Sequence, residues 1–144
     1  PTPQLYLSMN DAQIENSFTR ESITRSTASA NNTINMTTGL GGIIGEATCD
    51  FISQFQMDFG IIGISGITLD GSLVDFDFRE VKVAQAIINN SGTVILAADH
   101  SKFGRSAMVK QGSICQVNHL YTDQNPPAEI AEILSSHQID SHIV

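Results

Sequence analysis

The sequence lacks the features that mark several classes of protein. It contains no Trp, and no run approaches the roughly 18 apolar residues that a membrane-spanning helix needs. Its first residues, PTPQLYLSMNDAQ, place no positive charge ahead of an apolar stretch, so a signal peptide is not expected. Basic residues are scarce as well, because 7 Lys and Arg face 15 Asp and Glu, which gives a formal net charge of −8. Such a chain repels nucleic-acid phosphates, and we expect a cytoplasmic protein that does not bind DNA by itself or associate with a membrane.

Metal-binding and redox motifs are equally scarce. The two cysteines, Cys49 and Cys115, lie far apart and fit no metal or redox spacing, so we interpret them as free thiols in a reducing cytosol. Three aspartates between residues 70 and 77 lack the spacing and the terminal bidentate Glu of a calcium loop. The four histidines show no ligand spacing on a common helix face: His100, His119, His137 and His142. Neither a metal nor a cofactor is therefore predicted.

Residues 1–40 differ in character from the remainder of the chain. The stretch from Ser17 to Thr38 is dense in Ser, Thr and Asn and keeps no clear hydrophobic period. Before it, the pattern allows a short strand over Leu5–Met9 and a short helix over Asp11–Thr19. Polar stretches of this kind bury too little apolar surface to offset chain entropy easily. We interpret residues 1–40 as weakly structured or dependent on the rest for order.

Clearer signals of secondary structure begin at Gly41. The run TVILAA is the clearest buried strand, and a polar loop from Asp99 to Arg105 follows it. Asp70-Gly71 predicts a turn. In chain order, the predicted elements are a helix (46–55), a strand (60–65), a helix from 77 to a C′ glycine at 92, two strands (93–98 and 117–122), a helix to about 136 and an edge strand (139–144).

The helix that begins at Asp77 has the strongest local signals. Asp77 and Glu80 have the N-cap and N3 spacing of a capping box, and Gly92 fits the C′ position. Apolar spacing predicts one buried face: Phe78, Val81, Gln85 and Ile88, with Ala84 and Ile87 beside it. A stable helix at this place would connect two strands.

Helices that alternate with Ile- and Val-rich strands predict an α/β fold, a Rossmann-like and mostly parallel sheet flanked by helices. In such sheets, ligands bind outside the carboxyl ends of the strands. The turn Gly63–Gly66 and the loop Asp99–Arg105 each follow a predicted strand. We therefore expect both segments on the same rim of the sheet.

Two long runs resemble a known family. These are GGIIGEATCDFISQFQMDFGIIGISGITLDGSLVDFDFREV and DHSKFGRSAMVKQGSI, and the tail with YTDQNPP is similar in plan. They resemble the sensor domain of bacterial DeoR-type transcriptional repressors, in particular the members that control glycerol-3-phosphate regulons. We assign residues 41–144 to the C-terminal part of that effector-binding domain and residues 1–40 to a polar N-terminal region outside the match. The resemblance implies a fold related to sugar-phosphate isomerases and a homo-oligomer that leaves its operator DNA on binding a phosphorylated metabolite, with glycerol-3-phosphate as the expected effector.

The sequence departs from the family pattern in three places. No N-terminal winged helix-turn-helix is recognised in the 144 residues, so operator binding requires such a domain outside them. The family's early phosphate-binding loop, Asp-x-Gly-Thr-Thr after a strand, has no counterpart in residues 1–40. Where the family usually carries a lysine after Glu80, this chain has Ala84, and Lys82 lies on another helix face.

Seven residues are candidates for effector binding. Lys102 offers a point charge to a phosphate, and Ser101 either donates a hydroxyl hydrogen bond to it or caps the turn. Asp99 either orients Lys102, bonds a ligand hydroxyl or forms the turn. The turn around Ser65 either presents backbone amides to an anion or serves close packing. The full set is Gly63, Ser65, Gly66, Glu80, Asp99, Ser101 and Lys102.

Glu80 also carries the rival hypothesis, an aldose–ketose isomerase acting on a sugar phosphate. That reaction needs a carboxylate base beside the substrate, and related isomerases keep an acidic residue near this place. No second acid pairs with Glu80 in a recognisable motif, and no Gly-x-Ser-x-Gly elbow supports nucleophilic catalysis. The sequence therefore favours a sensor over an enzyme, and a fragment that retains only the fold is the third alternative.

Overall fold

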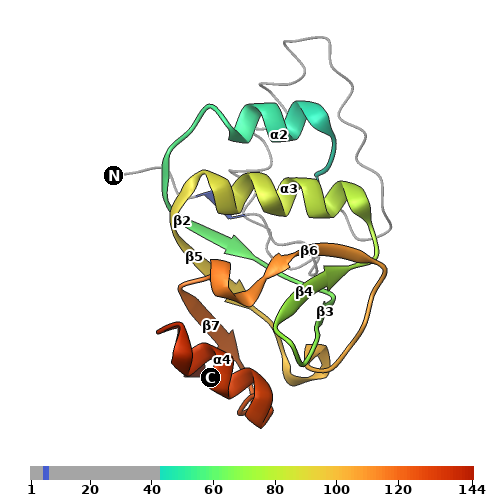
Figure 1. Cartoon of the computed structure of the whole chain (residues 1–144). Helices are drawn as coiled ribbons and strands as arrows, with labels where there is room; N and C mark the ends of the chain where they lie inside the picture. The colour runs from blue at the N-terminus through green and yellow to red at the C-terminus, as the bar shows by residue number, and fades with distance from the viewer. Residues whose placement is uncertain (1–4, 7–42) are drawn as a thin grey trace.

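A five-stranded parallel sheet forms the centre of the fold (Figure 1). The computed structural model describes residues 5–6 and 43–144. All neighbouring strands of this main sheet pair in parallel, which confirms the predicted α/β class. In spatial order the strands are β1 (Leu5–Tyr6), β2 (Met57–Ile62), β5 (Ser91–Ala97), β7 (His119–Thr122) and β8 (Asp140–Ile143).

The predicted strands match the main sheet with shifted ends. The strand expected over 60–65 is β2, which ends at Ile62 and leaves Gly63 to Ser65 in a loop. β5 is buried on one face only, because Val94 and Leu96 are buried while Ala97 is exposed. The expected edge strand is confirmed as β8, which pairs only with β7 among the described strands. Of the strand allowed over Leu5–Met9, residues 5–6 are described as β1, whereas the helix allowed over 11–19 lies outside the described residues.

A second, antiparallel sheet was not expected from the sequence. It consists of β3 (Gly66–Ile67), β4 (Ser72–Asp75) and β6 (Val109–Ser113), in the order β3-β4-β6. The predicted turn at Asp70-Gly71 is confirmed and joins β3 to β4, with Gly71 at a φ of 83° that favours glycine. The strands escaped the sequence pattern because β3 has two residues and β6, VKQGS, has little apolar periodicity.

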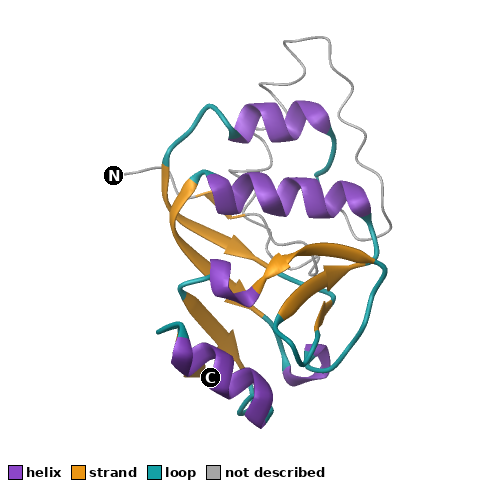
Figure 2. Cartoon of the chain, viewed as in Figure 1, coloured by secondary structure: helices purple, strands orange, loops and turns teal. Residues whose placement is uncertain are grey.

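Helices α2 (Glu46–Ile52) and α3 (Phe78–Asn89) lie side by side, and α4 (Ala128–Ser136) packs near β8 (Figure 2). α2 ends three residues earlier than predicted, whereas α4 ends at the predicted Ser136. Short 3₁₀ turns, η1 (His100–Lys102) and η2 (Ile114–Gln116), follow β5 and β6. None of the helices within residues 43–144 is long and apolar enough to cross a membrane.

The predictions for α3 were right about its start and wrong about other details. Asp77 is the N-cap as predicted. The helix ends at Asn89 with Asn90 as its cap, and Gly92 belongs to β5 instead of serving as the C′ residue. The buried face is also shifted, since Phe78 is 59% exposed and Gln85 and Ile88 are only half-buried. The buried residues of α3 are Glu80, Val81, Val83, Ala84 and Ile87.

One apolar core joins the main sheet, the second sheet and the helices. Each central strand contributes a fully buried side chain, namely Ile62, Leu96 and Leu120. Ile87 from α3 and Ile130 from α4 join the same cluster. Because this core fixes β2 and β5 side by side, it also fixes the loops that follow them.

Candidate functional site

The two segments predicted to share a rim do meet at the carboxyl end of the main sheet. β2 and β5 are paired neighbours, with Ile62 opposite Leu96 at their ends. Beyond these ends, the Gly104 N–H donates to the Ile67 carbonyl at 2.7 Å, and Phe103 forms an isolated parallel bridge with Ile67. We call the segments 63–66 and 99–105 the rim loops.

Gly66 lets the rim loops approach each other. A Cβ on Gly66 would collide with the Arg105 carbonyl oxygen and would lie 3.1 Å from the Val74 side chain. The packing interpretation of Gly66 therefore has direct support from the geometry. Gly63 is half-buried in the connection between β2 and β3.

The loop after β5 is organised by its own side chains. Asp99 caps η1, where its carboxylate accepts a hydrogen bond from the Ser101 N–H at 2.8 Å. Hydrogen bonds from Ser101 lower the pKa of Asp99, so this carboxyl is ionised at neutral pH. Ser101 is exposed and Lys102 is half-buried. The loop thus presents a hydroxyl and an ammonium beside one carboxylate.

Sequence reasoning missed the contact that ties this loop to the next strand. Asp123 directly follows β7, and its carboxylate accepts from the His100 N–H at 2.6 Å. The other carboxylate oxygen lies 2.6 Å from His100 Nδ1, and these hydrogen bonds lower the pKa of Asp123. The signal that could have revealed Asp123 is its position at the carboxyl end of a predicted strand.

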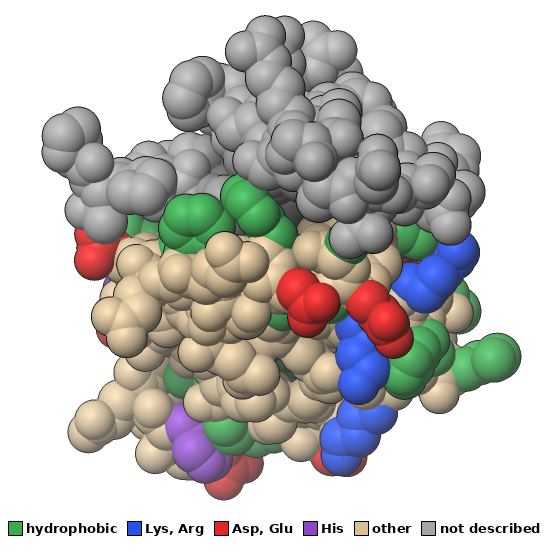
Figure 3. Space-filling model, turned by 90° about the horizontal axis from the view of Figure 1, so that it is seen from above, with side chains coloured by type: hydrophobic (Ala, Val, Ile, Leu, Met, Phe, Trp, Pro, Cys, Tyr) green, Lys and Arg blue, Asp and Glu red, His purple; other side chains and the backbone are tan. Residues whose placement is uncertain are grey.

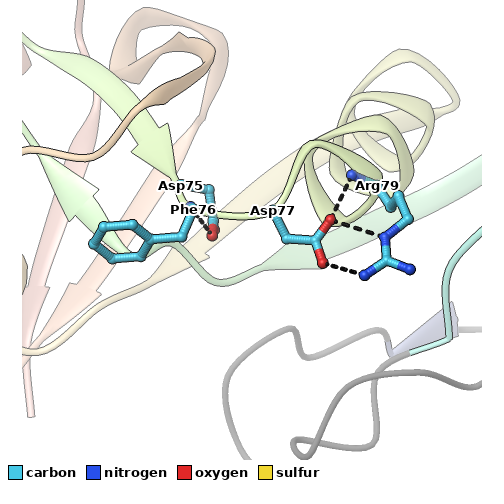
Figure 4. Close-up of polar contacts among 4 residues, drawn as sticks. All are labelled: Asp75, Phe76, Asp77 and Arg79. Carbon is cyan, nitrogen blue, oxygen red and sulfur yellow. Dashed lines mark hydrogen bonds and ion pairs between the residues drawn. The ribbon is translucent and has the colours of Figure 1, made fainter.

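Ser65 faces a buried carboxylate instead of solvent. Its hydroxyl donates to Asp75 Oδ1 at 2.9 Å, and both residues are buried. The Phe76 N–H donates to the same oxygen at 2.7 Å, at the end of β4 (Figure 4). Sequence reasoning missed Asp75 as a site residue and considered it only among three aspartates that do not form a calcium loop. Its burial depends on the second sheet, which the sequence pattern did not predict.

Glu80 is buried near the same place. The Asp77 cap accepts from the Arg79 N–H at 2.8 Å, and Figure 4 shows the Arg79 side chain turned back onto the Asp77 carboxylate. At η2, Ser113 and Gln116 form a complete capping box. At α3, Asp77 caps the helix but Glu80 does not complete a capping box, so the prediction of a box at Asp77 and Glu80 was wrong. Desolvation, and then the charges of Asp75 and Asp77, raise the pKa of Glu80.

The raised pKa of Glu80 predicts a pH-dependent stability. A buried carboxyl with a raised pKa favours folding while it is protonated, and this stabilisation is lost as the pH rises through the folded-state pKa. We expect Glu80→Gln to melt at a higher temperature than the original chain at about pH 8 and to lose this advantage by about pH 4, where an ordinary Glu is protonated. Thermal unfolding followed by circular dichroism across this range measures the difference. The exposed Glu132 on α4 supplies the matched variant, Glu132→Gln, which should melt like the original chain throughout; an equal shift for both variants would refute the argument.

Lys82 is exposed on α3, with its ammonium 5.1 Å from the Phe78 ring centroid, whereas Ala84 is fully buried. The two faces predicted for these residues are therefore confirmed. Cys49 and Cys115 are both free thiols, and burial raises the pKa of Cys49. The described residues contain no group of three or more His, Cys, Asp or Glu that could hold a metal ion.

The family profile described as the DeoR C-terminal sensor domain matches residues 23–124, which include both rim loops. The chain belongs to this family. The match starts inside residues 1–40, so the boundary at residue 41 stays a prediction. Described residues 43–124 of the match cover the whole second sheet and most of the main one.

Several similar proteins are named as repressors. The glycerol-3-phosphate regulon repressor of Escherichia coli K12 is 61% identical over 99 residues, which are 69% of this chain and 39% of the relative. The protein of the same name from Haemophilus influenzae is 57% identical over 86 residues, or 60% of this chain and 34% of the relative. The HTH-type transcriptional repressor CsqR of E. coli K12 is 35% identical over 99 residues, or 69% and 38%. The chain thus spans about two fifths of the length of these relatives or less.

Proposed function

We propose that this chain is the effector-sensing part of a bacterial transcriptional repressor and that it binds a phosphorylated small molecule, with glycerol-3-phosphate as the first candidate. The observation that carries the proposal is the 61% identity to a repressor named for the glycerol-3-phosphate regulon. The family match across both rim loops supports placing the effector there. The proposed binding residues are those of the rim together with Glu80, namely Gly63, Ser65, Gly66, Glu80, Asp99, Ser101 and Lys102.

The chemistry of the rim fits an anion with hydroxyl groups. Lys102 supplies the positive charge and Ser101 a hydroxyl donor, both on the loop that Asp99 caps. With a net charge of −8, the chain as a whole does not attract phosphate, so attraction must be local. The described part of the face seen in Figure 3 carries acidic and basic side chains next to one another.

In this proposal, the effector acts by shifting a population. A ligand changes the balance between two arrangements of an oligomer only by the difference between its affinities for them. Operator binding belongs to a helix-turn-helix domain of the kind named in CsqR, and we place the whole protein in the cytoplasm as a homo-oligomer. The sensing part then needs a site that differs between the DNA-bound and the released arrangement.

Calorimetric titration with glycerol-3-phosphate tests the proposal. We expect saturable heat and a higher melting temperature, because a ligand that binds only the folded state stabilises it. Glycerol without phosphate should produce neither effect. Cooperative unfolding of the unliganded chain must be seen first, since it separates a folded sensor from a fragment without function. The proposal fails if a cooperatively folding chain shows no heat and no thermal shift at millimolar ligand.

One observation keeps an isomerase as a second candidate. Glu80 is a buried carboxyl with a raised pKa, which is the property that a general base near neutral pH requires. The named relatives are repressors, and this weighs against catalysis. Exchange of the C2 proton of a pentose or hexose phosphate with solvent, followed by NMR, distinguishes the two functions. Exchange above the uncatalysed rate would favour the isomerase.

A further inference from the structure

Two buried side chains on the second sheet lack hydrogen-bond partners. Within the described part of the chain, Asp75 Oδ2 and both polar atoms of the Gln111 side chain have none. Asp75 is 1% exposed and Gln111 is 3% exposed. The other Asp75 oxygen is occupied, since it accepts from the Ser65 hydroxyl and the Phe76 N–H. One carboxylate oxygen and one whole amide are therefore left over.

Strand pairing places these two residues in the same region. β4 and β6 are neighbours, with Asp75 opposite Val109 and Leu73 opposite Gly112. The register shifts between Leu73 and Val74, so Gln111 is the additional residue on the β6 side. Gln85 of α3 donates to the Gln111 carbonyl at 2.9 Å, which holds the backbone of the irregular position. The bulge is thus a fixed feature of the fold, while the amide it carries stays unpaired.

Buried polar atoms without partners are costly and rare. Each loses its hydrogen bonds to water and gains none within the protein, so native structures nearly always supply a partner. Here the unpaired atoms comprise a carboxyl oxygen, an amide oxygen and an amide nitrogen that donates. A hydroxyl group donates and accepts at once, so adjacent hydroxyls would satisfy such a set.

We propose that Asp75 and Gln111 form a hydroxyl-binding subsite of the effector site, where the unpaired carboxyl oxygen and the unpaired amide bind hydroxyl groups of the phosphorylated effector. This inference rests on the proposed function, and it adds two residues that are not on the rim loops. Ser65 connects the subsite to the rim, since it lies in the loop after β2 and its hydroxyl bonds Asp75. In this arrangement, Lys102 meets the phosphate and the second sheet binds the hydroxylated carbon chain.

The enclosure of the subsite gives the effector a means of acting on the protein. The unpaired atoms are shielded from solvent, so a ligand reaches them only if neighbouring side chains or the rim loops move. Binding then favours an arrangement in which Asp75 and Gln111 are paired over one in which they are not. A difference of this kind is what a ligand needs to shift a population.

Gln111→Met tests the subsite, because Met keeps the length of the side chain and removes both unpaired polar atoms. We expect the unliganded variant to melt a few degrees higher than the original chain, since its side chain leaves nothing polar buried without a partner. Calorimetry compares glycerol-3-phosphate with propyl phosphate, which has the phosphate and the carbon chain but no hydroxyl. The original chain should prefer glycerol-3-phosphate by about tenfold or more, the worth of one to two hydrogen bonds, and the preference of the variant should fall severalfold because the amide no longer contributes.

Gln116→Met is the matched control, because Gln116 accepts a hydrogen bond from the Ser113 N–H at 3.0 Å in the η2 capping box. It should melt lower than the original chain and keep the preference for glycerol-3-phosphate. If Gln111→Met melts lower and also keeps the preference, a buried water fills the subsite and the inference is overturned. If the original chain binds both phosphates equally, the subsite fails while the proposed function stands. If it binds neither, both fail.

Discussion

Replacing Gly66 with Ala is expected to destabilise the chain strongly and to weaken effector binding. The new Cβ would collide with the Arg105 carbonyl oxygen, and a backbone atom cannot move aside as a flexible side chain can. Overpacking of this kind costs about 3 kcal/mol, which corresponds to roughly 10 °C in melting temperature for a domain of this size. Thermal unfolding measures the loss. The affinity for the effector should fall as well, because the collision separates the rim loops.

Gly92→Ala is the control for Gly66→Ala. Gly92 lies in β5, and a Cβ there would stand 3.4 Å from the nearest atom, the Asp58 carbonyl oxygen. A methyl group fits at that distance, so the melting temperature should change by no more than about 2 °C. Equal losses at both positions would show that the loss of stability does not come from a collision between the new Cβ at Gly66 and Arg105.

Replacing Lys102 with Gln is expected to weaken binding of glycerol-3-phosphate by about 10- to 100-fold. The estimate follows from a charge-assisted hydrogen bond of about 1.5–3 kcal/mol, with tenfold in affinity for each 1.4 kcal/mol. Lys102 is half-buried on a surface loop, so the melting temperature of the unliganded chain should stay within a few degrees. Calorimetric titration gives the affinity, and Lys102→Arg should recover part of it because the charge is kept.

Lys82→Gln removes the same charge from the exposed side of α3. Lys82 is exposed on α3 beside Phe78, so its loss should change the affinity by less than about threefold, through general electrostatics alone. Similar losses for the Lys82 and Lys102 variants would mean that net charge, and not the rim, governs the attraction of the anion. Unchanged affinity in Lys102→Gln would place the phosphate elsewhere.

The main sheet was predictable because its strands and helices carry strong local patterns. TVILAA identified β5, and the Asp77 cap identified the start of α3. The second sheet was not predictable, since β6 holds a buried Gln111 and gains its order from pairing with β4. The shift of the buried face of α3 has the same origin. Glu80 is buried because the helix packs over strands that the pattern did not reveal, and Phe78 is exposed in consequence.

The candidate site was also predictable only in part. Strand ends predicted that the rim loops would meet, because that conclusion needs only the parallel order of β2 and β5. The pairing of Ser65 with Asp75 and of His100 with Asp123 depends on how separate strands are placed beside one another. Sequence spacing gives no access to such contacts. Unpaired buried atoms, as in Gln111, are visible only in three dimensions.

The order of strands in the second sheet also bears on the course of folding. β4 and β6 are direct neighbours, yet the chain between Asp75 and Val109 contains all of α3 and β5. Closing that long loop costs entropy that is recovered only after α3 and β5 have formed. The hairpin of β3 and β4 is local, whereas the addition of β6 is a late, high-contact-order event. The part of the second sheet that holds Asp75 and Gln111 is therefore expected to be among the last parts of the molecule to assemble and among the first to open.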